Sequence, residues 1–267
     1  PLKVGIAQIK PKLLNIQENL KKHLDYLEMA KGKGLDLLVF PELSLTGYLT
    51  NWITPIVSLS EGSKEMNEIL EKAKGISLIF GAIIEDRGQF YNSAIFVEDG
   101  KILGIHRKVY LPTYGMFDEG RYFTRGKSFS PIESKLGRFG ILICEDAWHL
   151  DAYLEYSNCD YIVIISNNPL RGVGERSSIE VWHTLAGIPP LFFGTPTIYA
   201  NRVGVEDGII FFGRSRIVDG DGRVLAEGKE FEEELVIAEI NPYTSRAMRF
   251  RSATLREHLN ALGKDAR

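Results

Sequence analysis

The chain has 267 residues, of which 44% are hydrophobic, which is enough for a buried core and excludes a disordered chain. Its 32 basic and 35 acidic residues leave a formal charge of −3, so no basic excess is offered to nucleic acid. Two cysteines are too few for a disulfide scaffold and indicate thiols in a reducing compartment, by default the cytoplasm. No run of about 18 apolar residues is present to span a membrane, and the start lacks the apolar core of a signal peptide.

The N-terminal half alternates apolar runs of strand length with amphipathic helices. Asn15 is followed three residues later by Glu18, a spacing typical of a helix N-cap. Asp99-Gly100 between two apolar runs predicts a hairpin, so the sheet is not purely parallel. We expect strands at 2–9, 35–40, 77–84, 91–97 and 101–107, and helices at 16–30 and 64–74.

The C-terminal half continues this alternation and therefore predicts α/β layers. The pair Pro189-Pro190 ends or restarts a helix, because proline lacks the N–H that a helix interior needs. No linker, low-complexity tract or clear repeat interrupts the chain, so we expect a single domain over residues 1–267. We expect strands at 140–143, 161–166, 197–203, 213–219, 223–227 and 235–240, and helices at 147–158, 177–186 and from 242 onward.

Three reactive side chains stand where predicted strands end: Glu42, Lys108 and Cys144. Strand ends of layered α/β proteins face a crevice, although such residues are more often solvated or, for cysteine, inert core residues. Cys144 stands at a strand-to-helix turn, which exposes a nucleophile beside free backbone N–H groups. Cys159 enters a strand from a loop and is expected to be structural.

Three segments carry a resemblance to the nitrilase, or carbon–nitrogen hydrolase, superfamily: residues 40–48 (FPELSLTGY), 107–112 (RKVYLP) and 143–146 (ICED). Similar residues at 4–8 and 200–204 extend it over nearly the whole chain. The resemblance implies an α-β-β-α sandwich whose subunits form a homodimer or larger homo-oligomer. It also implies that Glu42, Lys108 and Cys144 are the Glu-Lys-Cys triad and that Glu119 is an additional catalytic carboxylate.

These residue types suit the cleavage of a carbon–nitrogen bond. An amide carbonyl is a poor electrophile, so it needs a strong nucleophile such as the thiolate of Cys144. We expect the Lys108 ammonium to lower the pKa of this thiol and, with the backbone N–H of Glu145, to stabilise the oxyanion. Glu42 would carry the thiol proton to the leaving amine and later activate the water that hydrolyses the thioester.

The segments 111–119 and 144–148 look most like the glutaminase domain of glutamine-dependent NAD synthetases. Glu145-Asp146 stands where nitrilases usually carry Trp-Glu, which favours amides over nitriles as substrates. Nothing resembles the Ser-Gly-Gly phosphate loop of a synthetase domain, so we expect a free-standing amidase acting on a small amide. Arg171 could pair with a substrate carboxylate. By placement, the candidate substrate-binding residues are Tyr48, Tyr114, Phe117, Trp148, Asn168 and Arg171.

Four alternatives remain open. The chain could be a glutaminase that supplies ammonia to a partner synthetase, an acyltransferase that uses the same thioester, or an inactive scaffold of the same fold. A metal site built from Cys144, Glu145, Asp146 and His149 is disfavoured, because three adjacent residues cannot easily face one ion. We therefore expect no metal, no cofactor, and no nucleic-acid or membrane partner. Residues 187–194 (GIPPLFFG) depart from the family pattern and form either an interface or core.

Overall fold

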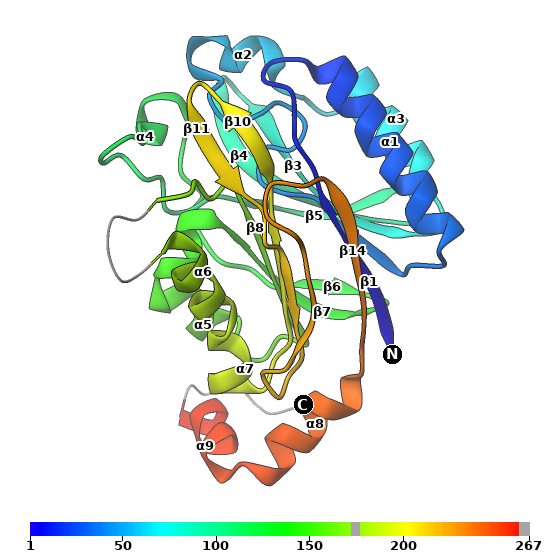
Figure 1. Ribbon diagram of the computed structural model, residues 1–267, viewed down its shortest axis with the longest axis vertical. Coiled ribbons are helices and arrows are strands. Elements are labelled where there is room, and N and C mark those ends of the chain that lie inside the picture. The colour runs from blue at the N-terminus through cyan, green and yellow to red at the C-terminus, as the bar shows by residue number, and fades with distance from the viewer. Residues whose placement is uncertain (172–176, 262–267) are drawn as a thin grey trace.

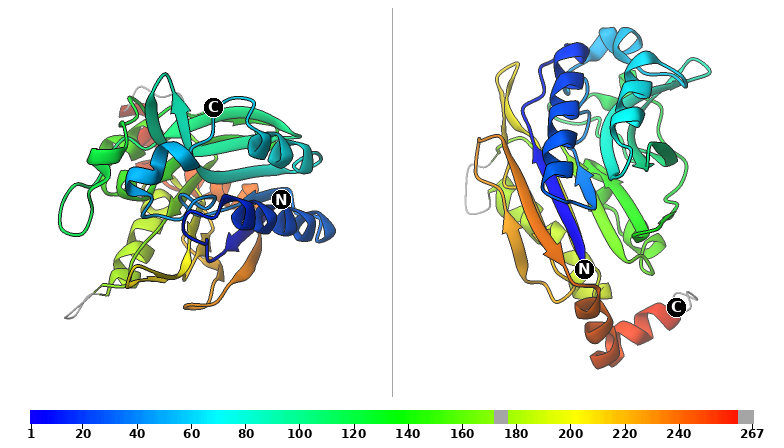
Figure 2. Two further views of the ribbon diagram at one scale, coloured as in Figure 1. Left: turned by 90° about the horizontal axis from the view of Figure 1, so that it is seen from above. Right: turned by 90° about the vertical axis from the view of Figure 1, so that its right-hand side faces the viewer.

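In the computed structural model, which describes residues 1–171 and 177–261, two six-stranded sheets stack face to face with helices on both outer sides (Figure 1). Strands β10 (Val203–Glu206) and β11 (Ile209–Phe212) form a separate two-stranded hairpin. Helices α8 (Pro242–Arg251) and α9 (Ala253–Ala261) extend from one end of the sandwich (Figure 2). No helix in the described residues is both long and apolar enough to cross a membrane.

The first sheet has the strand order β14-β1-β2-β3-β4-β5. Strands β1, β2 and β3 are parallel, and the other pairs are antiparallel. Helices α1 (Ile16–Gly32) and α3 (Lys64–Lys72) cover its outer face, where Leu27 and Ile69 pack in one core with Phe80. The strands are β1 (Leu2–Gln8), β2 (Leu37–Val39), β3 (Ser77–Asp86), β4 (Gln89–Glu98), β5 (Lys101–Arg107) and β14 (Glu234–Ile240).

The second sheet has the order β13-β12-β9-β8-β7-β6, with β7, β8 and β9 parallel at its centre. Residues from α5 (Leu150–Glu155), α6 (Ser178–Ala186) and α7 (Ile188–Phe193) pack on its outer face. The strands are β6 (Ile132–Ser134), β7 (Gly137–Ile143), β8 (Tyr161–Ser166), β9 (Thr197–Asn201), β12 (Arg216–Val218) and β13 (Val224–Glu227).

A third core fills the space between the two sheets. Ile6 and Phe96 of the first sheet meet Phe139 and Ile198 of the second, and the rings of Phe96 and Phe139 contact edge to face with their centroids 5.1 Å apart. Because both faces of each sheet are covered, the central strands are apolar on both sides, as the sequence predicts. The predicted α/β class and α-β-β-α layering are confirmed.

Several predicted elements differ in detail. The helix predicted at 147–158 is a 3₁₀ turn, η2 (Cys144–Trp148), followed by the short α5. The strand predicted at 197–203 stops at Asn201, whereas Pro189-Pro190 restarts a helix, α7, which is one of the two outcomes expected there. The β10–β11 hairpin was not predicted, and neither were β6, η1 (Asn51–Ile53), α2 (Thr54–Val57) and α4 (Glu119–Tyr122).

Candidate active site

The ends of four strands meet on one side of the sandwich and deliver the predicted reactive side chains. Glu42 follows β2, Lys108 follows β5, and Cys144 follows β7, while Asn168 lies two residues beyond β8. Strands β2, β7 and β8 belong to the central parallel parts of the two sheets. The carboxyl ends of these strands therefore bring residues up to 126 positions apart in the chain into one site.

Lys108 lies between two buried carboxylates. Its Nζ donates to Glu42 Oε1 at 2.7 Å and to Glu119 Oε1 at 2.8 Å, and all three side chains are almost fully buried. Burial opposes the charge of Lys108, but the carboxylates of Glu119 and Glu42 outweigh it and hold the lysine pKa well above its usual range. Lys108 is therefore a fixed ammonium, with one of its three N–H donors left over after these two hydrogen bonds.

Glu42 is held from three directions. Besides Lys108, Asn92 Nδ2 donates to its Oε1 at 2.8 Å, and the backbone N–H of Asn167 donates to its Oε2 at 2.9 Å. The backbone at Glu42 also lies directly against Gly81 of β3, where a Cβ atom would come within 2.3 Å of Leu43 N. Only glycine permits this approach, so Gly81 and Asn92 support the site although no motif marks either of them.

Glu119 joins the cluster from the first turn of α4. Its Oε2 accepts a hydrogen bond from the hydroxyl of Tyr48 at 2.7 Å. Burial raises the pKa of Glu119 to about 7, because the nearby Glu42 adds to the effect of burial while Lys108 and Tyr48 only partly offset it. Glu119 therefore changes its charge near neutral pH, which its sequence position does not indicate.

Cys144 adopts a backbone conformation that is unusual for a residue with a side chain. Its φ is +46°, in the left-handed region, at the point where β7 turns into η2. Holding a non-glycine residue there costs on the order of 1 kcal/mol or more, and such strain is common at functional sites. The turn presents Sγ to Asn168, whose Nδ2 lies 3.3 Å away, while the hydroxyl of Tyr199 fixes the Asn168 amide by donating to its Oδ1 at 2.6 Å.

The charge state expected for Cys144 is corrected by the structure. Burial raises the pKa of the Cys144 thiol well above its usual range, and Glu42 raises it further. The nearby Lys108 ammonium lowers it, but by less than burial or Glu42 raises it. Lys108 therefore lowers the pKa of the thiol, as expected, but burial and Glu42 outweigh it, so the net shift is upward and the thiol needs a base at the moment it reacts.

Asp146, two residues after Cys144, holds the turn in place. Its Oδ2 accepts from Ile143 N at 3.1 Å and contacts His106 Nε2 at 2.8 Å, and its Oδ1 accepts the backbone N–H groups of Val109 and Tyr110. It thereby ties the Cys144 turn to the segment that carries Lys108. The metal site considered for this stretch is not formed, since Asp146 is turned inward and the described residues contain no cluster of metal ligands.

A pocket of about 250 Å³ opens beside Cys144. Five of the six predicted substrate-binding residues line it: Tyr114, Phe117, Trp148, Asn168 and Arg171. Tyr48 is not among its lining residues and lies behind it against Glu119. The lining also includes Glu145, Pro112 and Trp182, which the sequence analysis did not propose for substrate contact.

The pocket carries one charge of each sign. The carboxylate of Glu145 accepts a hydrogen bond from the Tyr114 hydroxyl at 2.8 Å, and the guanidinium of Arg171 lies 4.5 Å from the centre of the Phe117 ring. Among the described residues, no carboxylate lies within 4.0 Å of the Arg171 guanidinium. A guanidinium that lines a pocket suits an anionic group of a ligand.

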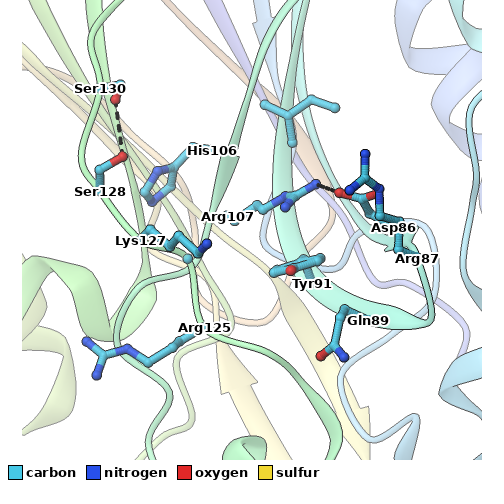
Figure 3. A pocket seen from close by; sticks show the side chains of 12 residues that line it. Asp86, Arg87, Gln89, Tyr91, His106, Arg107, Arg125, Lys127, Ser128 and Ser130 are labelled. Atoms are coloured by element: carbon cyan, nitrogen blue, oxygen red, sulfur yellow. Dashed lines mark hydrogen bonds and ion pairs between the residues drawn. The ribbon is translucent and has the colours of Figure 1, made fainter.

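A second pocket, of about 420 Å³, lies where β3, β4 and β5 meet the segment 125–130 (Figure 3). Its basic side chains do not point to one centre: Arg107 turns to Asp86, at 2.8 Å, and Arg125 points away from it (Figure 3). Neither Cys144 nor a carboxylate of the Lys108 cluster lines it. The pocket beside Cys144 is therefore the candidate active site.

Known proteins with similar sequences match nearly the whole chain. The family model described as carbon-nitrogen hydrolase matches residues 3–250. The glutamine-dependent NAD(+) synthetase of Thermotoga maritima is 33% identical over 262 residues, covering 90% of this chain and 42% of that protein. A probable nitrilase of Schizosaccharomyces pombe is 29% identical over 245 residues, covering 87% of this chain and 86% of its own length. The chain thus spans less than half the length of the synthetases it matches.

Solved structures share the fold. The crystal structure of a carbon-nitrogen hydrolase from Helicobacter pylori superposes with a TM-score of 0.83 at 27% identity, covering 96% of this chain and 94% of that one.

Proposed function

The chain belongs to the carbon–nitrogen hydrolase family, and from this premise we propose that it hydrolyses a small primary amide and releases ammonia. The reaction runs through a thioester on Cys144. The observation that carries the proposal is the strained turn that places Cys144 in the wall of the pocket, where its thiol interacts electrostatically with the buried Glu42, Lys108 and Glu119.

In the first half-reaction, Glu42 takes the proton from Cys144 as Sγ attacks the amide carbonyl carbon. Negative charge then develops on the carbonyl oxygen. The remaining N–H of Lys108 and the backbone N–H of Glu145, in the first turn of η2, stabilise this oxyanion. Glu42 passes the proton to the nitrogen, the carbon–nitrogen bond breaks, and ammonia leaves behind a thioester.

In the second half-reaction, Glu42 removes a proton from water, which attacks the thioester carbon. The carbon–sulfur bond breaks, the carboxylic acid leaves, and Sγ regains the proton from Glu42. Glu119 keeps Lys108 directed at the reacting oxygen through its 2.8 Å hydrogen bond. Glu42 can therefore act as the base in both half-reactions while Lys108 remains charged throughout.

The test is ammonia release from a panel of substrates: glutamine, asparagine, propionamide, an ω-amidated dicarboxylate, an N-carbamoyl amino acid and a nitrile. We expect release from one amide class by the wild type and none by Cys144→Ala or Cys144→Ser. Cys159→Ala is the matched control, because Cys159 is buried in the core of the second sheet, away from the pocket. Loss of activity in Cys159→Ala alone would contradict the assignment of the nucleophile.

Glutamine is the second candidate substrate, because the pocket offers Glu145 to an ammonium group and Arg171 to a carboxylate. The similarity to glutamine-dependent synthetases supports it, and ammonia would then pass to a partner synthetase. Ammonia release from glutamine but not from propionamide favours this candidate. If the folded protein releases none from any amide, trapping the acyl group with hydroxylamine tests the remaining alternative, acyl transfer.

A further inference from the structure

Glu206, on β10 of the β10–β11 hairpin, forms a buried ion pair with Arg202, the residue just before β10. Arg202 is fully buried, Glu206 is nearly so, and Arg202 Nη1 donates to Glu206 Oε2 at 2.6 Å. The Arg202 guanidinium also lies 4.2 Å from the centre of the Phe211 ring. Taking two charges out of water costs about as much as their attraction returns, so this pair is a poor device for stability alone.

Glu206 also accepts hydrogen bonds from the backbone of a neighbouring turn. Its Oε1 accepts the N–H of Tyr48 at 2.9 Å and that of Leu49 at 2.6 Å. Gly47 precedes them with φ +81°, and a Cβ atom there would come within 3.0 Å of Glu206 Oε2. The carboxylate is therefore fitted closely against this turn and fixes its position.

Tyr48 connects this turn to the catalytic cluster. Its hydroxyl donates to Glu119 Oε2 at 2.7 Å, and Glu119 Oε1 accepts from Lys108 at 2.8 Å. The hairpin also contacts the ring of Tyr48 edge to face through Phe211. One end of Tyr48 is thus held by Glu206 and the other end holds Glu119.

We propose that Glu206 is a positioning residue for the reaction at Cys144: it fixes Tyr48 so that the tyrosine hydroxyl keeps the Glu119 carboxylate directed at Lys108. The inference rests on the proposed function. Four groups face Glu119, namely Lys108, Glu42, Tyr48 and Cys144. Burial raises the pKa of Glu119 most, and the Tyr48 hydrogen bond is one of the contacts that lower it. Losing the alignment of Tyr48 therefore moves this pKa upward.

The test compares wild type, Glu206→Gln, Tyr48→Phe and the double variant across pH 5 to 9. Two quantities are measured: kcat/KM for ammonia release, and the rate at which iodoacetamide alkylates Cys144, followed by mass spectrometry of its peptide. We expect each single variant to lower kcat/KM by about 10-fold or more, because small misplacements of reacting groups are costly. Titration of Glu119 should give both pH profiles an inflection near pH 7. Each single variant should shift this inflection to higher pH.

The double variant is the decisive measurement. Both changes act through one hydrogen bond, so the double variant should be little worse than either single one. Effects that multiply, or an inflection that stays in place while the rate falls, would overturn the proposal in favour of a purely structural role. The alkylation rate depends on the charge near Cys144 even if no amide is cleaved. Failure of the proposed function can therefore be told apart from failure of the role proposed for Glu206.

Two further variants complete the design. Glu227→Gln removes a partner of Arg216 on the β12–β13 pair, which has no contact with Tyr48, and should leave both pH profiles unchanged. Glu206→Gln combined with Arg202→Met removes both buried charges together, so it avoids an unpaired arginine if Glu206→Gln alone fails to fold. Its pH profiles should match those of Glu206→Gln, and wild-type profiles in this combined variant would refute the role of Glu206.

Discussion

Lys108 shows at the residue scale how burial and neighbouring charge act against each other. A lysine without partners would lose its charge at such a depth, but Glu42 and Glu119 each lie within 2.8 Å of its Nζ and keep it protonated. Burial raises the pKa of the Cys144 thiol most, and the same carboxylates raise it further while Lys108 lowers it. The ammonium of Lys108 is a fixed charge that can stabilise a reacting oxyanion.

We predict that Lys108→Ala retains the fold and lowers kcat by about 100-fold or more, the usual effect of losing an oxyanion donor. It should also leave Glu42 and Glu119 without a shared cation, which raises the pKa of Glu119 because Lys108 lowers it in the wild type. The measurement is ammonia release, with circular dichroism to check folding. Lys101→Ala, at the exposed start of the same strand, is the control, and a near-normal rate for Lys108→Ala would remove it from the mechanism.

Sequence reasoning located the reactive residues better than their supports. Glu42, Lys108 and Cys144 stand at strand ends beside recognisable motifs, and the structure brings them together. The contact of Tyr48 with Glu119 spans 71 residues, and that of Glu206 with Tyr48 spans 158. Such contacts form only because separate strands pack together, so no local sequence pattern predicts them. Asp146 was visible within its motif, but three of its four contacts are with His106 on β5 and with Val109 and Tyr110 just after it.

At the scale of elements, helix α1 is fastened to the segment that carries Glu42. His23 on α1 is fully buried, with Nδ1 2.7 Å from Asn19 O and Nε2 2.8 Å from Ser44 Oγ, and its ring stacks on Phe40 at 4.1 Å. Burial lowers the pKa of His23 to about 4, so the ring is neutral in the folded protein. The helix and the Glu42 segment therefore share a group that must be uncharged to fit.

The lowered pKa of His23 makes the free energy of unfolding depend on pH. Between about pH 4 and the ordinary histidine value of 6.5, the unfolded chain binds a proton at His23 and the folded chain does not. The free energy of unfolding therefore rises with pH across that range, by up to about 1.4 kcal/mol per unit from this group. We predict that His23→Gln removes this part of the slope in urea unfolding measured at pH 4.5, 5.5 and 6.5.

The comparison with the variant is needed because Glu119 acts in the opposite direction. Its raised pKa makes the folded state bind the extra proton up to about pH 7, so its contribution to stability falls as pH rises. Subtracting the two slopes isolates His23. Equal slopes in wild type and His23→Gln would show that the buried histidine is not linked to folding.

Elements with long, regular patterns were predicted well, and those shaped by tertiary contacts were not. The apolar spacing of α1 and its Asn15 cap gave both helix and start, and Asn15 Oδ1 accepts Glu18 N as expected. The stretch 147–158 carries a helical pattern, but its first part is η2 because Asp146 bonds backward to Ile143 and across to the segment after β5. The strand at 197–203 stops at Asn201, and Arg202 is turned inward toward Glu206.

At the scale of the whole molecule, the residue patterns predict layers of helices and of β-sheet. They do not predict which strands pair or how the two sheets pack on each other. Strand β14 pairs with β1 across more than 230 residues, with Leu2 opposite Ile240. The two central parallel groups then face one another through the core that contains Phe96 and Phe139. We propose that residues 1–267 act as one domain, because the site needs strand ends from both sheets.

The helices on the outer side of the second sheet expose large apolar side chains after this packing. Leu150 on α5 and Leu191 on α7 are 74% and 72% exposed, although other residues of the same helices are in the core of the second sheet. The stretch 187–194 is therefore both core and surface: Pro189, Pro190 and Phe193 are buried, whereas Leu191 projects outward. Exposed leucines of this size are costly to leave in water, and we propose that a second copy of the chain covers Leu191 and its surroundings.

We predict that size-exclusion chromatography with light scattering gives a mass of two or more chains of 30.0 kDa each. Leu191→Glu should lower that mass or weaken association by at least about 10-fold in dissociation constant, because a charge would be buried without a partner. Ile56→Glu is the control, since Ile56 is 78% exposed on α2 and far from α7 (Figure 1). A 30.0 kDa species at high concentration, or an unchanged mass for Leu191→Glu, would show that this face is not where copies meet.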